Sequence, residues 1–193
     1  MKDIETFRHI NVIEKQIIST SLSRISPRFL PILNEIEEYI FIKLSNQQSQ
    51  INYPSLYLLS EELGKIIQNP KITNDIVAGG LYFGFLKRGA FFISLESTGY
   101  FYRNGLFPDF AYMRVNKKGE KSILYGNNIM MFMETYLPPD LKKKDFLLVF
   151  NGLMEIIAIA QSTVDNKTIK NLKPKDIIAI NLSDKGLYLR EKQ

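Results

Sequence analysis

The chain has 193 residues, of which 45% are apolar and 23% charged, a composition typical of a folded chain with one large or two small domains. It has no cysteine and a single histidine, which excludes disulfides, thiolate metal sites, cysteine nucleophiles and sites that need two imidazoles. Residues 1–110 carry 11 basic and 11 acidic side chains, whereas residues 111–193 carry 14 and 9, so the net charge of +5 lies in the C-terminal part. A basic module suggests a polyanionic partner, and a solvated lysine-rich surface is the alternative.

The sequence also bears on the location of the protein. The longest apolar stretch, residues 146–160, is interrupted by Asn151 and Glu155 and is shorter than a membrane-spanning helix. The first five residues include acids and do not lead into the apolar core of a secretory leader. We therefore expect a cytoplasmic protein with no membrane segment. Because the chain has no cysteine and a single histidine, we also expect no protein-bound metal or other cofactor.

The first part of the chain predicts an α/β unit. Apolar residues recur every three or four positions over residues 4–23, which indicates a helix. Residues 29–44 fit both a helix and strands, and we expect a hairpin there. Residues 56–59 are typical of a short strand, after which Ser60 is expected to cap a helix that ends at Asn69 and Pro70.

Two further β-type runs follow, over residues 76–86 and 90–95. They are expected to pair antiparallel around the three-residue connection 87–89, whose glycine can adopt a left-handed conformation. Ser97 is expected to cap a short helix that reaches Tyr102. The polar run 45–50 is expected to form a loop.

From residue 111 the pattern changes to short strands at close spacing, which is typical of a small β-barrel or sandwich. The expected strands cover residues 111–115, 122–125, 146–150, 153–160, 177–181 and 186–190. The segment 107–109 is the expected boundary between the two parts.

No group of residues has the pattern of a catalytic site. Gly79, Gly80 and Gly84 lack the lysine and hydroxyl residue that follow a phosphate-binding loop. His9 has no nucleophile or acid placed to make it a general base, and the acids of residues 35–38 are typical of a solvated turn. We therefore expect no enzymatic activity.

A lysine-rich loop before residue 177 is the strongest candidate for binding. It contains Lys167, Lys170, Lys173 and Lys175. Lysines on a turn between strands can follow a phosphate backbone. The aromatic candidates for base stacking are Tyr112, Tyr125 and Tyr188, for which burial in the core is the alternative.

One run of residues points to a family. Ser122-Ile123-Leu124-Tyr125-Gly126-Asn127-Asn128 resembles the Ser-Phe-Leu-Tyr-Gly-Asn run that opens the RNA-binding PUA domain of the Nip-seven family, proteins of large-ribosomal-subunit biogenesis in archaea and eukaryotes. Further matches in register cover residues 57–63, 80–84, 160–163, 174–188 and 188–191. The resemblance extends over nearly the whole chain and is weakest over residues 20–55.

The resemblance implies an α+β fold, with an N-terminal α/β (pre-PUA) domain over residues 1–109 and a small PUA β-barrel over residues 110–193. It also implies a non-catalytic factor in ribosome biogenesis and pre-rRNA processing that binds U-rich single-stranded RNA. Together with the charge pattern it gives the expected RNA-binding residues Lys167, Lys170, Lys173, Lys175 and Arg190. The N-terminal domain is expected to dock ribosome-assembly proteins, and we expect a monomer.

Three positions depart from the family's pattern. Gln161 and Met131 replace lysines, and Glu155 stands where the family has a glycine. These departures favour an alternative, a protein-interaction adaptor of ribosome assembly whose PUA domain has lost RNA binding. An RNA-modifying enzyme with a PUA appendage is a third class, for which the sequence offers no base, nucleophile or cofactor loop.

Overall fold

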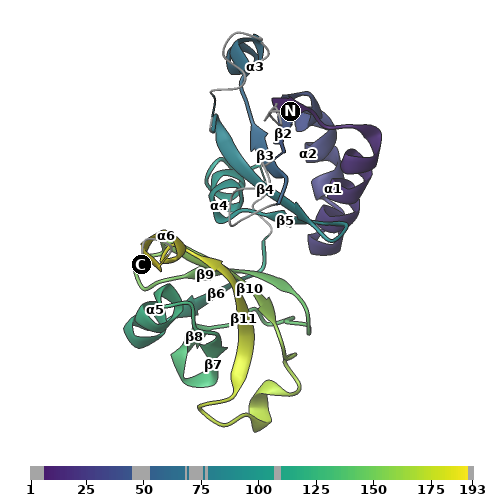
Figure 1. Cartoon of the computed structure of the whole chain (residues 1–193). Coiled ribbons are helices and arrows are strands. Elements are labelled where there is room, and N and C mark those ends of the chain that lie inside the picture. The colour runs from purple at the N-terminus through teal and green to yellow at the C-terminus, as the bar shows by residue number, and fades with distance from the viewer. Residues whose placement is uncertain are drawn as a thin grey trace. The chain divides into compact units, whose positions relative to one another are not determined.

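The computed structural model describes residues 7–44, 53–67, 69, 76, 78–106 and 110–190. The chain divides into two compact units, Met1–Leu106 and Phe107–Gln193, each of which contains its own sheet (Figure 1). The expected loop over residues 45–50 and the expected boundary at 107–109 lie outside the described residues.

The N-terminal unit is an antiparallel five-stranded sheet in the order β1-β2-β3-β4-β5 with helices packed on it. Its elements are β1 Phe7–His9, α1 Val12–Ile25, α2 Phe29–Ile36, β2 Ile40–Lys43, β3 Ser55–Leu58, α3 Glu61–Ile67, β4 Leu81–Lys87, β5 Ala90–Ile93 and α4 Leu95–Arg103. Phe83 of β4 packs edge-on against Phe101 of α4, which in turn contacts Phe29 of α2. All three rings are buried, so α2 and α4 share one core on one face of the sheet.

Two elements at the start of the chain differ from the expectation. The predicted helix over residues 4–23 is wrong at its beginning, because residues 7–9 form β1 and pair with β2. Asn11 starts α1 instead, with its side chain accepting from the Glu14 N–H and the Glu14 carboxylate accepting from the Asn11 N–H. The expected hairpin over residues 29–44 is also wrong: the helical and the β-type patterns are both real but occur in succession, as α2 and then β2.

The expectations for the middle of this unit are confirmed in part. The Ser60 hydroxyl accepts from the Leu63 N–H at the start of α3. Strands β4 and β5 pair antiparallel, but only Arg88 and Gly89 connect them, both with positive φ, so the turn is a two-residue primed turn and not the expected three-residue one. The residue that caps α4 is Ser94 and not the expected Ser97, because the Ser94 hydroxyl accepts from the Ser97 N–H.

The C-terminal unit is a nearly closed β-barrel with strand order β7-β11-β10-β9-β6-β8, antiparallel except for the parallel pair β6 and β9. Its elements are β6 Tyr112–Val115, α5 Lys117–Leu124, β7 Ile129–Met130, β8 Glu134–Tyr136, β9 Phe146–Phe150, β10 Ile156–Ser162, β11 Ile177–Asp184 and α6 Leu187–Arg190. Helix α5 contacts β6, β7, β10 and β11. The barrel interior is filled by apolar side chains, among them Met113, Ile123, Val149 and Ile178.

Two of the expected strands of this unit are helical. Residues 122–125 belong to the end of α5, which starts early because the Asn116 side chain accepts from the Gly119 N–H. Residues 187–190 form α6. The expected strands around residues 111–115, 146–150, 153–160 and 177–181 are confirmed, with shifts of a few residues at their ends.

Candidate nucleic-acid interface

The topology of the barrel places two lysine-bearing loops at the same end. Phe146 at the start of β9 pairs with Gln161 near the end of β10, and Ser162 of β10 pairs with Ala179 near the start of β11. The loops 137–145 and 163–176 therefore meet at this end, which we call the lysine end. The Asn166 N–H donates to the Leu141 carbonyl at 3.2 Å, and the Asn166 side chain also donates to the Pro139 carbonyl, so the two loops are in direct contact.

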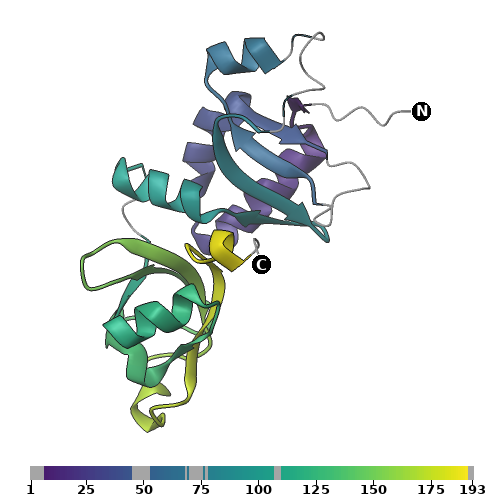
Figure 2. The same cartoon turned by 60° about the vertical axis from the view of Figure 1, so that its left-hand side comes forward.

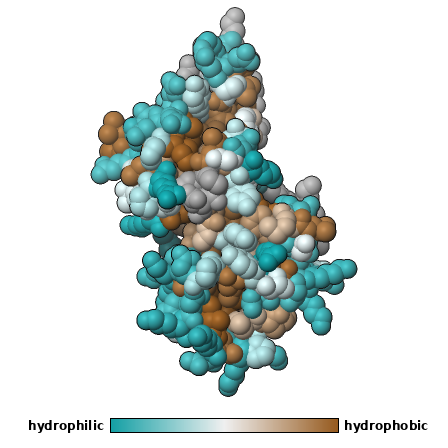
Figure 3. Space-filling model, turned by 180° about the vertical axis from the view of Figure 1, so that it is seen from behind, coloured by the Kyte–Doolittle hydropathy of each residue, from teal (hydrophilic) through white to brown (hydrophobic). Residues whose placement is uncertain are grey.

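Seven exposed lysines lie on these two loops. They are Lys142, Lys143, Lys144, Lys167, Lys170, Lys173 and Lys175. An open hollow of about 730 Å³ lies between the loops and is lined by Pro138, Pro139, Lys167, Ile169 and Lys170 among others. The loop 163–176 is at the foot of the C-terminal unit in Figure 1, and hydrophilic side chains cover that foot in Figure 3.

Three of the four aspartates of the lysine end accept hydrogen bonds from the backbone of their own turns, and the fourth, Asp140, is exposed. The Asp145 carboxylate accepts from the Lys142 N–H and the Asp176 carboxylate from the Lys173 N–H, both at 2.7 Å. Asp165 accepts from the Thr168 N–H and hydroxyl, and these hydrogen bonds lower the pKa of the Asp165 carboxyl. Among the described residues, no carboxylate forms a salt bridge with any of the seven lysines. Their ammonium groups are therefore open to a ligand.

The structure separates Arg190 from the four lysines that the sequence groups with it. Arg190 follows the far end of β11, and the eight residues of that strand span roughly 23 Å. Its guanidinium donates to both oxygens of Asp184, at 3.0 and 2.9 Å, and to the Leu124 carbonyl. Asp184 is only 3% exposed, so Arg190 balances a buried carboxylate.

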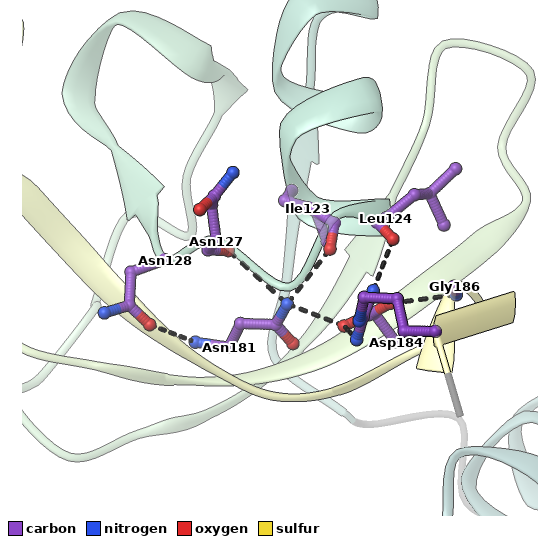
Figure 4. A network of polar contacts seen from close by, with 8 residues as sticks. Ile123, Leu124, Asn127, Asn128, Asn181, Asp184 and Gly186 are labelled. Atoms are coloured by element: carbon purple, nitrogen blue, oxygen red, sulfur yellow. Dashed lines mark hydrogen bonds and ion pairs between the residues drawn. The ribbon is translucent and has the colours of Figure 1, made fainter. Parts of the chain in front are cut away.

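The same network includes residues of the run 122–128. The Asn181 side chain donates to the Ile123 carbonyl and to Asp184, while the Asn128 side chain accepts from the Asn181 N–H (Figure 4). Gly186 lies against the Leu124 carbonyl so closely that a Cβ there would be 1.9 Å from its oxygen. Residues 123–128 are thus held against the end of β11 by hydrogen bonds and close packing.

Sequence analysis missed a second group of lysines, which lies outside the two loops of the lysine end. Lys117, Lys118 and Lys121 of α5 and Lys185 after β11 are exposed. The backbone N–H of Lys185 bonds to the Ile157 carbonyl, which places it beside the start of β10. The signal was present in the sequence as a Lys-Lys-x-x-Lys spacing, which only the helical state of α5 brings onto one surface.

The aromatic candidates are also divided. Tyr112 stacks on Tyr136 with ring centroids 4.9 Å apart, whereas Tyr125 is 65% exposed and lies after α5, away from the lysine end. The side chain of Tyr188 lies outside the described residues. Phe132, which the sequence did not suggest, is 44% exposed and its N–H bonds to the Pro174 carbonyl between Lys173 and Lys175.

The described residues contain neither a candidate metal site nor a candidate membrane-spanning helix. No group of three or more histidines, aspartates or glutamates there could hold a metal ion. No helix in the described part of the chain has both the length and the apolarity that crossing a membrane requires.

Comparison with known proteins gives a family for the C-terminal unit. Residues 111–193 match the UPF0113 PUA domain. No curated protein matches the chain.

Solved structures share the fold of the chain. A hypothetical protein of Pyrococcus horikoshii is 12% identical with a TM-score of 0.62 and covers 96% of this chain and 98% of its own. A PUA domain protein of Aeropyrum pernix is 12% identical with a TM-score of 0.55, covering 96% of this chain and 89% of its own. A conserved PUA domain protein of Thermoplasma acidophilum is 17% identical with a TM-score of 0.53, covering 84% and 91%. The chain therefore carries a C-terminal PUA domain of the UPF0113 type behind an N-terminal α/β unit.

Proposed function

We propose that this protein binds single-stranded RNA through the lysine end of its PUA domain and catalyses no reaction. PUA domains commonly bind RNA. The observation that carries the proposal is the gathering of seven exposed lysines on two touching loops, where three of the four aspartates are bonded to backbone N–H groups.

Lysines of this kind bind phosphates without reading sequence. Each ammonium group is a compact point charge on a flexible stem, so it can follow an irregular single strand. Neutralising phosphates releases counterions, which supplies affinity that falls with salt. Phe132 beside Lys173 and Lys175 offers a ring on which one base can stack.

The finer role that we propose is that of a Nip-seven-like factor in large-subunit ribosome biogenesis and pre-rRNA processing. The run 122–128 and its anchoring to β11 support this proposal, because the residues that carry the resemblance also hold the barrel together. In this role the protein is a cytoplasmic monomer that prefers U-rich RNA, and its N-terminal unit docks assembly proteins.

The adaptor without RNA binding is the second candidate, favoured by two departures at the lysine end. Gln161 donates to the Lys144 carbonyl, and the Met131 N–H bonds to the Asp176 carbonyl, so two lysines of the family's pattern are missing beside the loops. Glu155 is bonded to Asn151 at the opposite end of the barrel and does not bear on the lysine end.

Fluorescence anisotropy with a labelled oligo-U RNA tests the proposal. The variant in which Lys167, Lys170, Lys173 and Lys175 are changed to alanine should lose at least tenfold in affinity at low salt. The matched control changes Lys117, Lys118, Lys121 and Lys185 to alanine, which removes four charges from the same unit but outside the two loops. Equal losses in the two variants would overturn the assignment to the lysine end, and absence of binding by the wild type would favour the adaptor.

A further inference from the structure

A row of aromatic rings stands on one face of the N-terminal sheet. Phe85 of β4 pairs directly with Phe92 of β5, and their rings are nearly parallel at 11° with centroids 5.1 Å apart. The ring of Tyr53 stacks on the other side of Phe85 at 5.8 Å and 28°. We call these three residues the aromatic row.

This row is on the face that turns away from the buried core. Phe91 packs on the buried Phe83, whose ring contacts Phe101 of α4. Successive side chains of a strand point to opposite faces, so Phe92 points away from that core. Figure 2 shows the strands in front of α1 and α2, with this other face turned toward the viewer.

The two ends of the row differ in a way that suggests a ligand. At one end the Lys87 ammonium lies 4.5 Å from the centroid of the Tyr53 ring, which closes that end with a cation–π contact. At the other end Phe92 is on the edge strand β5, is 43% exposed, and within the described part of the chain its ring stacks only on Phe85. The row therefore ends in an open aromatic face onto which another flat ring can be added.

The charged side chains of the sheet indicate which kind of flat ring binds there. Of the charged side chains of the five strands, Arg8 is paired with Glu14 and Lys43 is buried, whereas Lys87 lies at the row, and none of these strands contains an aspartate or glutamate. Arg88 adds an exposed positive charge at the turn that leads into β5. Aromatic rings for stacking next to positive charge are the features that bind single-stranded nucleic acid.

We propose that Phe92 is a base-stacking site for single-stranded RNA on the N-terminal unit, with Arg88 contacting the adjoining phosphate. A base adds to the row as its fourth ring and is held by stacking. Since stacking depends little on sequence, the site accepts any base and favours purines, which have the larger ring face. This site is independent of the lysine end, because it relies on different residues of a different unit.

The absence of tryptophan from the chain makes a direct test possible. Phe92→Trp in the full chain introduces a single tryptophan whose emission should be quenched when a base stacks on it. Tyr100→Trp is the matched control, since Tyr100 is 42% exposed on α4 of the same unit but outside the row. Single-stranded oligo-A and oligo-U should quench position 92, oligo-A more strongly, and leave position 100 unchanged.

A duplex RNA separates stacking from charge attraction, because its bases are not free to stack. It should not quench position 92. Equal quenching by duplex and single strand, or no quenching at position 92, would overturn the proposal, and the latter result would leave the row as a surface for a protein partner.

Affinity measurements separate this site from the lysine end. In the background with Lys167, Lys170, Lys173 and Lys175 changed to alanine, single-stranded RNA should still quench Phe92→Trp. In the same background, Phe92→Ala should weaken binding by at least about fivefold, whereas Phe92→Tyr, which keeps a ring, should not. If Phe92→Ala has no effect there, the stacking site is refuted, although binding at the lysine end can stand.

Discussion

At the scale of single residues, Arg190 is the expected RNA-binding residue whose side chain is already engaged within the protein. Its side chain is 32% exposed, and its guanidinium donates to Asp184 and to the Leu124 carbonyl. We predict that Arg190→Ala lowers the free energy of unfolding by about 2 kcal/mol, because it leaves Asp184 buried without its countercharge. Chemical denaturation measures this loss, and Lys185→Ala next to the network should have almost no effect. A stable Arg190→Ala variant with impaired RNA binding would show instead that Arg190 is a ligand residue.

A second prediction concerns the lysines that begin α5. Lys117 and Lys118 occupy the first two positions of the helix, where positive charge is unfavourable to the helix dipole. Lys118→Glu should therefore stabilise the protein, by about 0.3–1 kcal/mol at low salt. Lys121→Glu, the same substitution in the last turn, should have the opposite sign. Thermal unfolding at low and high salt checks both, and an effect of the same sign at the two positions would contradict a dipole origin.

At the scale of elements, the sequence was informative where one local pattern decided the structure. The strands with continuous β-branched and apolar runs, such as β9, and the Ser60 cap of α3 were predicted because each depends on neighbouring residues. The errors arose where a cap several residues away decided the state. Asn116 makes residues 122–124 helical and Asn11 delays the first helix, although the apolar spacing alone allows other structures.

The candidate site could be predicted only in part, because some of its residues are far apart in the sequence. The four lysines of one loop could be grouped from their spacing, but the adjoining Lys142–Lys144 loop and Phe132 join them only through the pairing of β9, β10, β11 and β7. The division between Arg190 and the lysines depends on the direction of β11, which no local pattern reveals.

The junction of β1 with α1 gives a prediction on pH. Arg8 in β1 donates two hydrogen bonds to the Glu14 carboxylate, at 2.8 and 2.7 Å, and this contact lowers the pKa of Glu14. A lowered folded-state pKa stabilises the fold above the pKa of the unfolded chain, and the contribution is lost as the pH falls through the folded-state value. Wild type should therefore lose stability in acid more steeply than Glu14→Gln. Melting curves between neutral pH and about pH 3 measure the difference, and parallel curves would show that the ion pair contributes nothing.

At the scale of the whole molecule, the net positive charge lies in the C-terminal unit, and this distribution determines how RNA binding should respond to salt. Residues 1–110 have no net charge, so the electrostatic part of RNA binding is expected to come from the C-terminal unit. For a single strand, the logarithm of the binding constant falls by about 0.7 per phosphate neutralised for each unit of log salt. If all seven lysines of the lysine end take part, the slope is about −5, and changing Lys167, Lys170, Lys173 and Lys175 to alanine should bring it to about −2.

Titrations of a labelled oligo-U RNA at four salt concentrations measure these slopes. Phe92→Ala should weaken binding and leave the slope of the wild type unchanged, because stacking releases few counterions. The variant with Lys117, Lys118, Lys121 and Lys185 changed to alanine should also keep the wild-type slope. If the slope falls equally in the two lysine variants, RNA also contacts lysines outside the lysine end. RNA binding would then depend on the total charge of the C-terminal unit and not on the two touching loops.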